Sequence, residues 1–243
     1  MRRFSGKRYW LVGASEGLGR ALAHELSKAG AEVIVSARSQ ERLDDLVAEL
    51  PGPAQAVTVD VGDAESVRDA VTAAGPLDGM VYLAGLYWPM KATEWKMDDA
   101  ITMADVNFTG AVRAVGAVVP DMVARNEGHI VITGSLSGFR GLPGAIGYGA
   151  AKAGIMSLAE TMYADLRKTG VAVQLANPGF IKTRLTEKND FNMPFIMTPE
   201  EAAQAMFAHM KTDRFKVSFP RGFSYVFRGS QLLPDWAYYR LFS

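Results

Sequence analysis

Short apolar runs alternate along the chain with longer amphipathic segments. The apolar runs are rich in Val and Ile with little polar alternation, which is typical of strands buried on both faces of a sheet. Glycines follow several amphipathic segments, where a left-handed helix cap favours glycine. The predicted strands are 9–12, 32–36, 56–59, 79–83, 129–133 and 171–176, and the predicted helices are 18–29, 40–50, 64–74, 98–124 and 148–168.

This alternation predicts an α/β fold, a Rossmann-type doubly wound parallel β-sheet with helices on both faces. Right-handed crossovers would bring the carboxyl ends of the strands to one edge, where ligands bind. A chain of 243 residues fits a single domain. We assign residues 1–210, with a substrate loop around 180–200, to this fold, and residues 211–243 to a C-terminal segment of the same domain.

Composition removes several classes of function. The 26 basic and 26 acidic residues balance, so charge gives no support for a nucleic-acid partner. The chain has no cysteine, which excludes disulfides and thiolate metal sites and agrees with a cytoplasmic location. His24, His129 and His209 lack metal-ligand spacing, so we expect no metal site. The pattern predicts neither a signal peptide nor a membrane-spanning helix.

The first predicted strand runs into a glycine-rich turn and then a helix. Gly13 permits a tight turn, Gly17 lets the backbone approach a pyrophosphate, and Gly19 allows close helix–strand packing. The helix N-terminus adds free N–H groups and a positive dipole end. A sharp turn without a ligand is the alternative. The predicted dinucleotide contacts here are Gly13, Ser15, Glu16, Gly17, Leu18 and Gly19.

The second predicted strand ends beside Arg38, where an acidic residue would bind the adenosine ribose hydroxyls. A guanidinium there favours a 2′-phosphate, so we expect NADP, with NAD as the alternative. Ser15, Ser36 and Ser39 are expected to donate further bonds to this phosphate, and Glu16 is expected to point toward solvent. The alternative for Arg38 is a solvated loop arginine.

Tyr148 and Lys152 are four residues apart, a spacing that shares one face of a helix. A nearby ammonium favours the phenolate and lowers the pKa of a tyrosine from ~10. Ser135 follows the predicted strand 129–133 and would reach the same sheet edge, and Asn107 lies in the long helix before that strand. An exposed tyrosine–lysine pair is the alternative.

Seven motifs follow one another in a specific order. They are Gly13-x-x-x-Gly17-x-Gly19, Asp60-Val61, Ala84-Gly85, Asn107-x-x-Gly110, Ser135, Tyr148-x-x-x-Lys152 and Pro178-Gly179 followed by Thr183. Each motif is weak to moderate singly, but together the chain resembles the classical short-chain dehydrogenase/reductase family. The resemblance runs from about residue 6 to residue 183 and more loosely to residue 210.

The resemblance implies a role for each matching residue. Tyr148 would be the acid/base, Lys152 would lower its pKa and hold the nicotinamide ribose, Ser135 would bind the substrate oxygen, and Asn107 would support a water relay. Asn107, Tyr148 and Lys152 also count among the cofactor contacts. The remaining implied cofactor contacts are Asp60 and Val61 at the adenine, Ala84 and Gly85 in the groove, and Pro178, Gly179, Ile181 and Thr183 at the nicotinamide.

The chain departs from the family pattern at two positions. Val12 stands where the family usually has threonine, and Leu83 where it usually has asparagine. Because both family residues are mainly structural, we expect altered local hydrogen bonding and intact catalysis.

Apolar residues dominate the candidate substrate loops. A binding site with apolar walls favours an apolar ketone or secondary alcohol as substrate. Ordinary packing of the loops on one another explains about half of these apolar residues. The predicted substrate contacts are Ser135, Leu136, Phe139, Tyr148 and Phe180. Other apolar loop residues are Leu86, Tyr87, Trp88, Met90, Trp95, Leu142, Ile146, Phe191, Met193, Phe195 and Met197.

The segment 211–243 contains nine of the 24 aromatic residues and six Lys or Arg against two Asp. It is interpreted as a lid over the substrate groove, an oligomer contact within a homodimer or homotetramer, or a peripheral membrane contact.

Together these features favour an NADP(H)-dependent oxidoreductase that transfers a hydride between a nicotinamide cofactor and an apolar ketone or secondary alcohol. A non-catalytic nucleotide-binding sensor and a peripheral membrane protein using residues 211–243 are the alternatives. The joint presence of Ser135, Tyr148 and Lys152 argues against the sensor, which needs none of them together.

Overall fold

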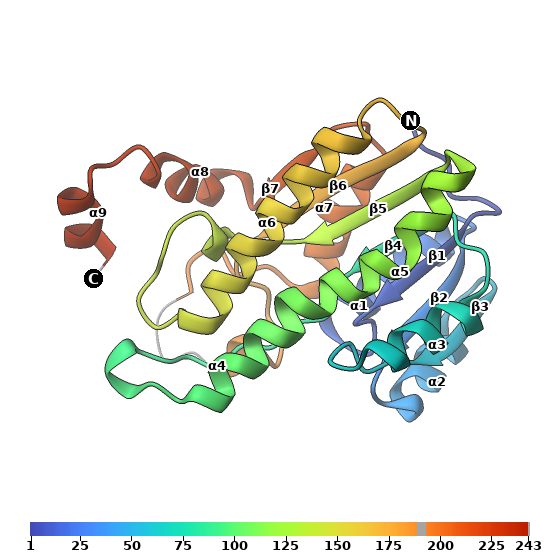
Figure 1. Ribbon diagram of the computed structural model, residues 1–243, viewed down its shortest axis with the longest axis horizontal. Coiled ribbons are helices and arrows are strands. Elements are labelled where there is room, and N and C mark those ends of the chain that lie inside the picture. Colours follow the sequence, from blue (N-terminus) through green and yellow to red (C-terminus); the bar gives the residue numbers. More distant parts are fainter. Residues whose placement is uncertain (189–192, 243) are drawn as a thin grey trace.

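A single parallel sheet forms the centre of the computed structural model, which describes residues 1–188 and 193–242 (Figure 1). Its seven strands run in the order β3-β2-β1-β4-β5-β6-β7, and every neighbouring pair is parallel. The strands are β1 (Arg8–Val12), β2 (Glu32–Ala37), β3 (Ala54–Thr58), β4 (Gly79–Tyr82), β5 (Gly128–Thr133), β6 (Val171–Pro178) and β7 (Lys216–Phe219).

Helices cover both faces of this sheet and enclose two apolar cores. One core joins the sheet to α1 (Gly17–Lys28), α2 (Gln40–Glu49) and α7 (Pro199–Met210). The other joins it to α3 (Ala64–Ala74), α5 (Gly110–Arg125) and α6 (Ile146–Leu166). Because β1, β4 and β5 are covered on both faces, their residues are almost all buried, which explains the lack of alternation in the sequence. The predicted single doubly wound parallel sheet is confirmed.

The structure adds a seventh strand that the sequence pattern did not predict. β7 pairs with β6, with Val217 beside Ala176. This edge strand is short and begins with the exposed Lys216, so it lacks the apolar run that marks the buried strands. The segment after residue 210 therefore supplies part of the sheet before it forms α8 (Arg221–Ser230) and α9 (Asp235–Phe242).

The long helix predicted at 98–124 is divided in the structure. α4 (Met97–Ala104) is followed by a π-helical stretch, Asp105–Thr109, and then by α5. One extra residue in such a turn shifts the helix face, and π-bulges occur frequently at functional sites. Asn107 lies within this stretch.

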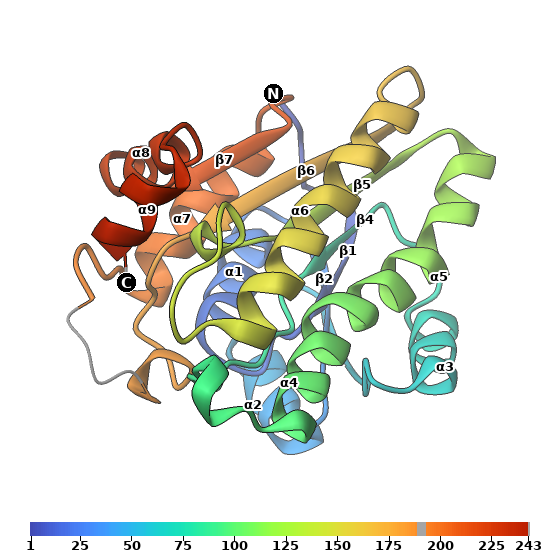
Figure 2. The same ribbon diagram turned by 60° about the vertical axis from the view of Figure 1, so that its left-hand side comes forward.

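The two C-terminal helices lie at one end of the molecule, beside the segment that leads into α6 (Figure 2). Within the described ranges, no helix has both the length and the apolar character needed to cross a bilayer.

Candidate active site

The turn after β1 is shaped by glycines that leave no room for a side chain. Gly13 has a positive φ of 96°, and a Cβ on it would clash with the backbone nitrogen of Ala84. A Cβ on Gly19 would clash with the carbonyl oxygen of Gly13. The turn leads into α1, and no side chain caps the N-terminus of that helix. Its first residues line the groove and leave N–H groups without a side-chain cap, an arrangement that fits the pyrophosphate of a dinucleotide.

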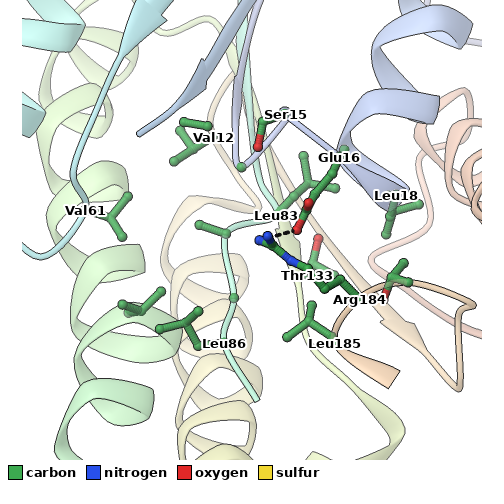
Figure 3. Close-up of a pocket in the computed structure, with 18 of the residues that line it drawn as sticks. Val12, Ser15, Glu16, Leu18, Val61, Leu83, Leu86, Thr133, Arg184 and Leu185 are labelled. Atoms are coloured by element: carbon green, nitrogen blue, oxygen red, sulfur yellow. Dashed lines mark ion pairs between the residues drawn. The ribbon is translucent and has the colours of Figure 1, made fainter. Parts of the chain in front are cut away.

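One groove at the carboxyl edge of the sheet collects the predicted cofactor residues, with Asn107 as the exception (Figure 3). The predicted residues that line it are Gly13, Ser15, Glu16, Gly17, Leu18, Gly19, Arg38, Asp60, Val61, Ala84, Gly85, Tyr148, Lys152, Pro178, Gly179, Ile181 and Thr183.

The groove is also lined by two arginines that the sequence did not predict. Arg42 lies inside α2, four residues beyond Arg38, and Arg184 directly follows the last motif residue, Thr183. Both fall outside the family motifs, and an exposed arginine carries no positional signal by itself.

The two arginines hold Glu16 between them. The carboxylate of Glu16 lies 3.1 Å from Nη1 of Arg42 and 2.9 Å from Nη2 of Arg184. Figure 3 shows the Arg184 guanidinium reaching across the groove toward the glycine turn. The expectation that Glu16 points toward solvent was wrong, because its side chain lines the groove and these two cations attract its carboxylate.

The serines near Arg38 differ in their positions. Ser39 is the N-cap of α2, and its Oγ accepts a hydrogen bond from the backbone N–H of Arg42 at 3.5 Å. Ser36 is completely buried, and its Oγ accepts from Nε1 of Trp10 at 2.8 Å. The expectation that Ser36 reaches a phosphate was wrong, since its side chain is enclosed beneath the sheet edge.

The predicted acid/base group is assembled where α6 meets the end of β5. Tyr148 shares a side-chain hydrogen bond with Ser135. Oγ of Ser135 accepts from the backbone N–H of Ser137 at 3.1 Å, which leaves the serine hydrogen available for donation. Lys152 is buried, and its Nζ donates to the carbonyl oxygen of Thr133 at 2.9 Å.

Burial has opposite effects on the two titratable groups. It raises the pKa of the Tyr148 phenol above its ordinary value of 10.0, although the hydrogen bond with Ser135 lowers it in part. It lowers the pKa of the Lys152 ammonium to about 8. A pKa decrease for Tyr148 caused by Lys152 was expected and is not found. The ammonium instead donates to Thr133 and lies 5.6 Å from the tyrosine ring centroid. At neutral pH the phenol is therefore protonated.

Asn107 does not line the groove and instead binds the backbone of a segment that does. Its Nδ2 donates to the carbonyl oxygens of Leu86 at 2.7 Å and Met103 at 2.8 Å, and its Oδ1 accepts from the N–H of Leu86 at 3.2 Å. A Cβ on Gly85 would lie 2.9 Å from that Oδ1. The buried amide of Asn107 therefore fixes the segment after β4, and its contact with the cofactor stays a prediction.

The other predicted substrate residues, Ser135, Leu136, Phe139 and Phe180, lie outside the lining of the groove. Leu136 is buried at the turn after Ser135, and the Tyr87 ring meets the Tyr148 ring edge-on at 5.1 Å. The Phe180 ring lies 5.9 Å from that of Phe223 in α8. Phe191 was also expected on this side and lies outside the described residues.

Arg140 and Phe139 connect the segment after Ser135 to the C-terminal helices. Nη1 of Arg140 donates to the carbonyl oxygens of Ser230 and Leu233, each at 2.8 Å, and its guanidinium lies 4.0 Å from the Tyr238 ring centroid. The carbonyl oxygen of Phe139 accepts a hydrogen bond from the side-chain amide of Gln231, just after α8, at 3.0 Å. These helices therefore pack beside the predicted substrate region, as a lid would.

The two departures from the family pattern meet each other in the structure. The N–H of Leu83 donates to the carbonyl oxygen of Val12 at 2.8 Å, so the backbone keeps β1 and β4 together with these apolar side chains. Among the described residues, no three His, Asp or Glu side chains cluster as a metal site would require.

Comparison with known proteins gives the family. The family model described as short chain dehydrogenase matches residues 7–193, which includes every motif from the glycine turn to Thr183. This chain belongs to the short-chain dehydrogenase/reductase family. It is therefore an oxidoreductase of that family, and its sheet and helices form the family's Rossmann-type domain.

Curated relatives and solved structures cover most of the chain. An uncharacterized oxidoreductase of Myxococcus xanthus is 36% identical, over 97% of this chain and 96% of its own. A 3-oxoacyl-[acyl-carrier-protein] reductase of Thermotoga maritima is 31% identical, over 88% and 86%. The closed form of a serine dehydrogenase complexed with NADP+ has 27% identity and a TM-score of 0.77, covering 86% of this chain and 94% of its own.

Proposed function

We propose that this protein is an NADP(H)-dependent oxidoreductase that transfers a hydride between the nicotinamide and an apolar ketone or secondary alcohol, with Tyr148 as the acid/base. The observation that carries the proposal is that Tyr148 and Lys152 line the same groove as Arg38 and Arg42. Backbone N–H groups at the start of α1 would bind the pyrophosphate, and Asp60 would lie at the adenine.

The residues of the chain have distinct roles in the reduction. The hydroxyls of Ser135 and Tyr148 donate hydrogen bonds to the carbonyl oxygen of the substrate, and the Tyr148 proton moves to that oxygen as the alcohol forms. The raised pKa keeps this proton on the phenol at neutral pH. The bound nicotinamide supplies the hydride. Lys152 uses one N–H on the Thr133 carbonyl and offers the others to the ribose hydroxyls. Oxidation reverses the proton transfer.

The preference for NADP rests on two cations at the adenosine end. Arg38 and Arg42 line the groove there, although Glu16 already holds Arg42. A charge-assisted contact with a 2′-phosphate contributes ~1.5–3 kcal/mol, or a ~10- to 100-fold preference, and exposure and salt bring it toward the lower value.

The cofactor test is kcat/KM for NADPH and NADH in the wild type, Arg38→Ala and Ala37→Asp at two salt concentrations. We expect the wild type to favour NADPH, Arg38→Ala to lose most of that preference, and Ala37→Asp to reverse it by repelling the phosphate. A wild type that favours NADH, or a ratio unchanged in Arg38→Ala, would refute the assignment.

An apolar substrate is supported by the aromatic surroundings of Tyr148, which include Tyr87, and by the name of the 3-oxoacyl reductase relative. The test is NADPH oxidation with cyclohexanone, acetophenone and 2-decanone. We expect turnover with at least one ketone. Binding of NADPH without turnover of any carbonyl compound would favour the nucleotide sensor.

We also propose a homodimer or homotetramer located in the cytoplasm. The exposed apolar residues Met97 and Ile101 on α4 and Val112 and Val123 on α5 support self-association. Light scattering after size exclusion measures the assembly, and a monomer at micromolar concentration would contradict this part of the proposal.

A further inference from the structure

The helices α8 and α9 have an inner face that is firmly attached to the protein. Phe227 and Tyr238 are buried there, and the Tyr238 hydroxyl donates to the carbonyl oxygen of Gly141 at 2.6 Å. Arg140 binds the end of α8, the start of α9 and the turn between them. The outer faces of α8 and α9, opposite these contacts, are therefore held in fixed orientations.

The outer face of α8 combines two arginines with an aromatic ring. Arg221, Tyr225 and Arg228 are spaced by four and three residues, which places them on one side of a helix. All three are exposed, and Tyr225 keeps 63% of its surface in contact with solvent.

The outer face of α9 repeats this composition. Tyr239 and Arg240 lie three and four residues after Trp236, and all three are exposed, Trp236 by 74%. Leu232, in the turn between the helices, is 88% exposed. Trp and Tyr rings with an apolar body and a polar edge are suited to the region between lipid headgroups and acyl chains.

The charge on these outer faces is positive, and the described part of the chain gives it no ion-pair partner. None of the ion pairs among the described residues includes Arg221, Arg228 or Arg240. The acid on these helices, Asp235, is already paired with Arg140. We infer that the outer faces of α8 and α9 dock on the surface of an anionic lipid bilayer, with the arginines at the headgroups and Trp236 and Leu232 in the acyl boundary.

Charge favours a bilayer over a second copy of the chain. A two-fold symmetric contact brings the same patch of two molecules together, so this positively charged patch would meet a second patch of the same positive charge. A surface of phosphate headgroups offers these cations counter-charges without any requirement for matched geometry.

The experiment is sedimentation of the full-length protein with vesicles of phosphatidylcholine that contain ~30% of the anionic lipid phosphatidylglycerol. Vesicles of pure phosphatidylcholine serve as the comparison. We expect binding to the anionic vesicles, a roughly 20-fold loss in Arg228→Gln/Arg240→Gln, and a several-fold loss in Trp236→Ser. Matched controls are Arg68→Gln/Arg167→Gln and Trp95→Ser, which change exposed residues elsewhere and should bind like the wild type.

Three results would overturn the inference. They are wild-type binding no stronger to anionic than to neutral vesicles, variants that bind like their controls, and self-association that Trp236→Ser abolishes without any vesicle binding. Turnover of the ketone that the wild-type protein reduces best is measured in the same samples and should be unchanged in Trp236→Ser. Vesicle binding without turnover of any of the three ketones would refute the proposed chemistry and leave the docking surface intact.

Discussion

The cofactor groove and the substrate region meet at Tyr148, but they are built in different ways. The glycine turn of the groove is formed by backbone, because Gly13 and Gly19 pack directly against other main-chain atoms. The substrate region is joined by long side chains, chiefly Arg140, whose partners lie about 90 residues later in the chain. A backbone cradle restricts the residue types that can form it, whereas side-chain contacts between distant segments can be replaced more freely.

This difference predicts which changes affect which region. A change in the groove should alter cofactor binding whatever the substrate is. A change in the substrate region should leave the cofactor affinity intact. The residues that touch both regions, Tyr148 and Lys152, should give the largest effects.

Tyr148→Phe removes the phenolic hydroxyl, with its exchangeable proton, at the boundary of the two regions. We expect kcat to fall ~10²- to 10⁴-fold, the usual contribution of a general acid, with the dissociation constant for NADPH within about twofold of the wild type. Stopped-flow turnover and fluorescence titration measure the two values. A variant that keeps half of the wild-type kcat would remove Tyr148 from the acid/base role.

Lys152 should give a pH dependence to cofactor binding. Burial disfavours its charged form and lowers its pKa to about 8, so the ammonium is lost as the pH rises through that value. We expect NADPH to bind more weakly above about pH 8. Lys152→Ala should weaken binding ~10- to 100-fold and remove this pH dependence. A wild-type affinity that stays constant from pH 6 to pH 9.5 would contradict the ribose contact.

A pair of glycine substitutions compares the glycine turn of the groove directly with the C-terminal helix α8. A Cβ on Gly19 would clash with main chain, whereas nothing lies within 4 Å of a Cβ on Gly222 in α8. We expect Gly19→Ala to lower the free energy of unfolding by about 3 kcal/mol and to abolish NADPH binding. Gly222→Ala should be neutral or stabilising by up to ~1 kcal/mol. Urea unfolding measures both, and equal values would remove the distinction between the regions.

Arg140→Gln tests the side-chain connection in the substrate region. The variant loses hydrogen bonds to Ser230 and Leu233 and the contact with the Tyr238 ring, and we expect local stability to fall by about 2 kcal/mol. Hydrogen exchange should become faster across residues 221–242 while β1 and α1 keep wild-type protection. Faster exchange in both places would mean that the regions are not independently built.

Glu16→Gln should give the smallest effect, because exposed ion pairs contribute only ~0–1 kcal/mol. The substitution frees Arg42 and Arg184 and removes a negative charge from the glycine turn. We expect the NADPH-to-NADH ratio of kcat/KM to rise about two- to fivefold. A fall in this ratio would show that Glu16 positions Arg42 for the phosphate.

The same contrast explains what could be predicted from sequence. The glycine turn was predictable because main-chain crowding leaves glycine as the residue that fits at Gly13 and Gly19. The central strands β1, β4 and β5 were predictable because both of their faces are buried and apolar. Edge strand β7 was not, since it is short and begins with an exposed lysine.

The polar details of the site depended on tertiary contacts that no local pattern encodes. The position of Glu16 between Arg42 and Arg184 joins three separate segments. The direction of the Lys152 ammonium depends on the Thr133 carbonyl at the end of β5. Arg140 belongs to no sequence motif. Its role in holding α8 and α9 is visible only in the folded structure, where its side chain reaches the segment that joins them.

The most direct test of the proposed reaction follows the hydride itself. NADPH carrying deuterium at both C4 positions is incubated with the protein and the ketone that is turned over best, and the product alcohol is examined by mass spectrometry and NMR. We expect one deuterium at the carbinol carbon with the wild-type protein, and at most a trace with Tyr148→Phe. An unlabelled alcohol, or no alcohol from any ketone while NADPH binds tightly, would contradict the assignment as an NADP(H)-dependent carbonyl reductase.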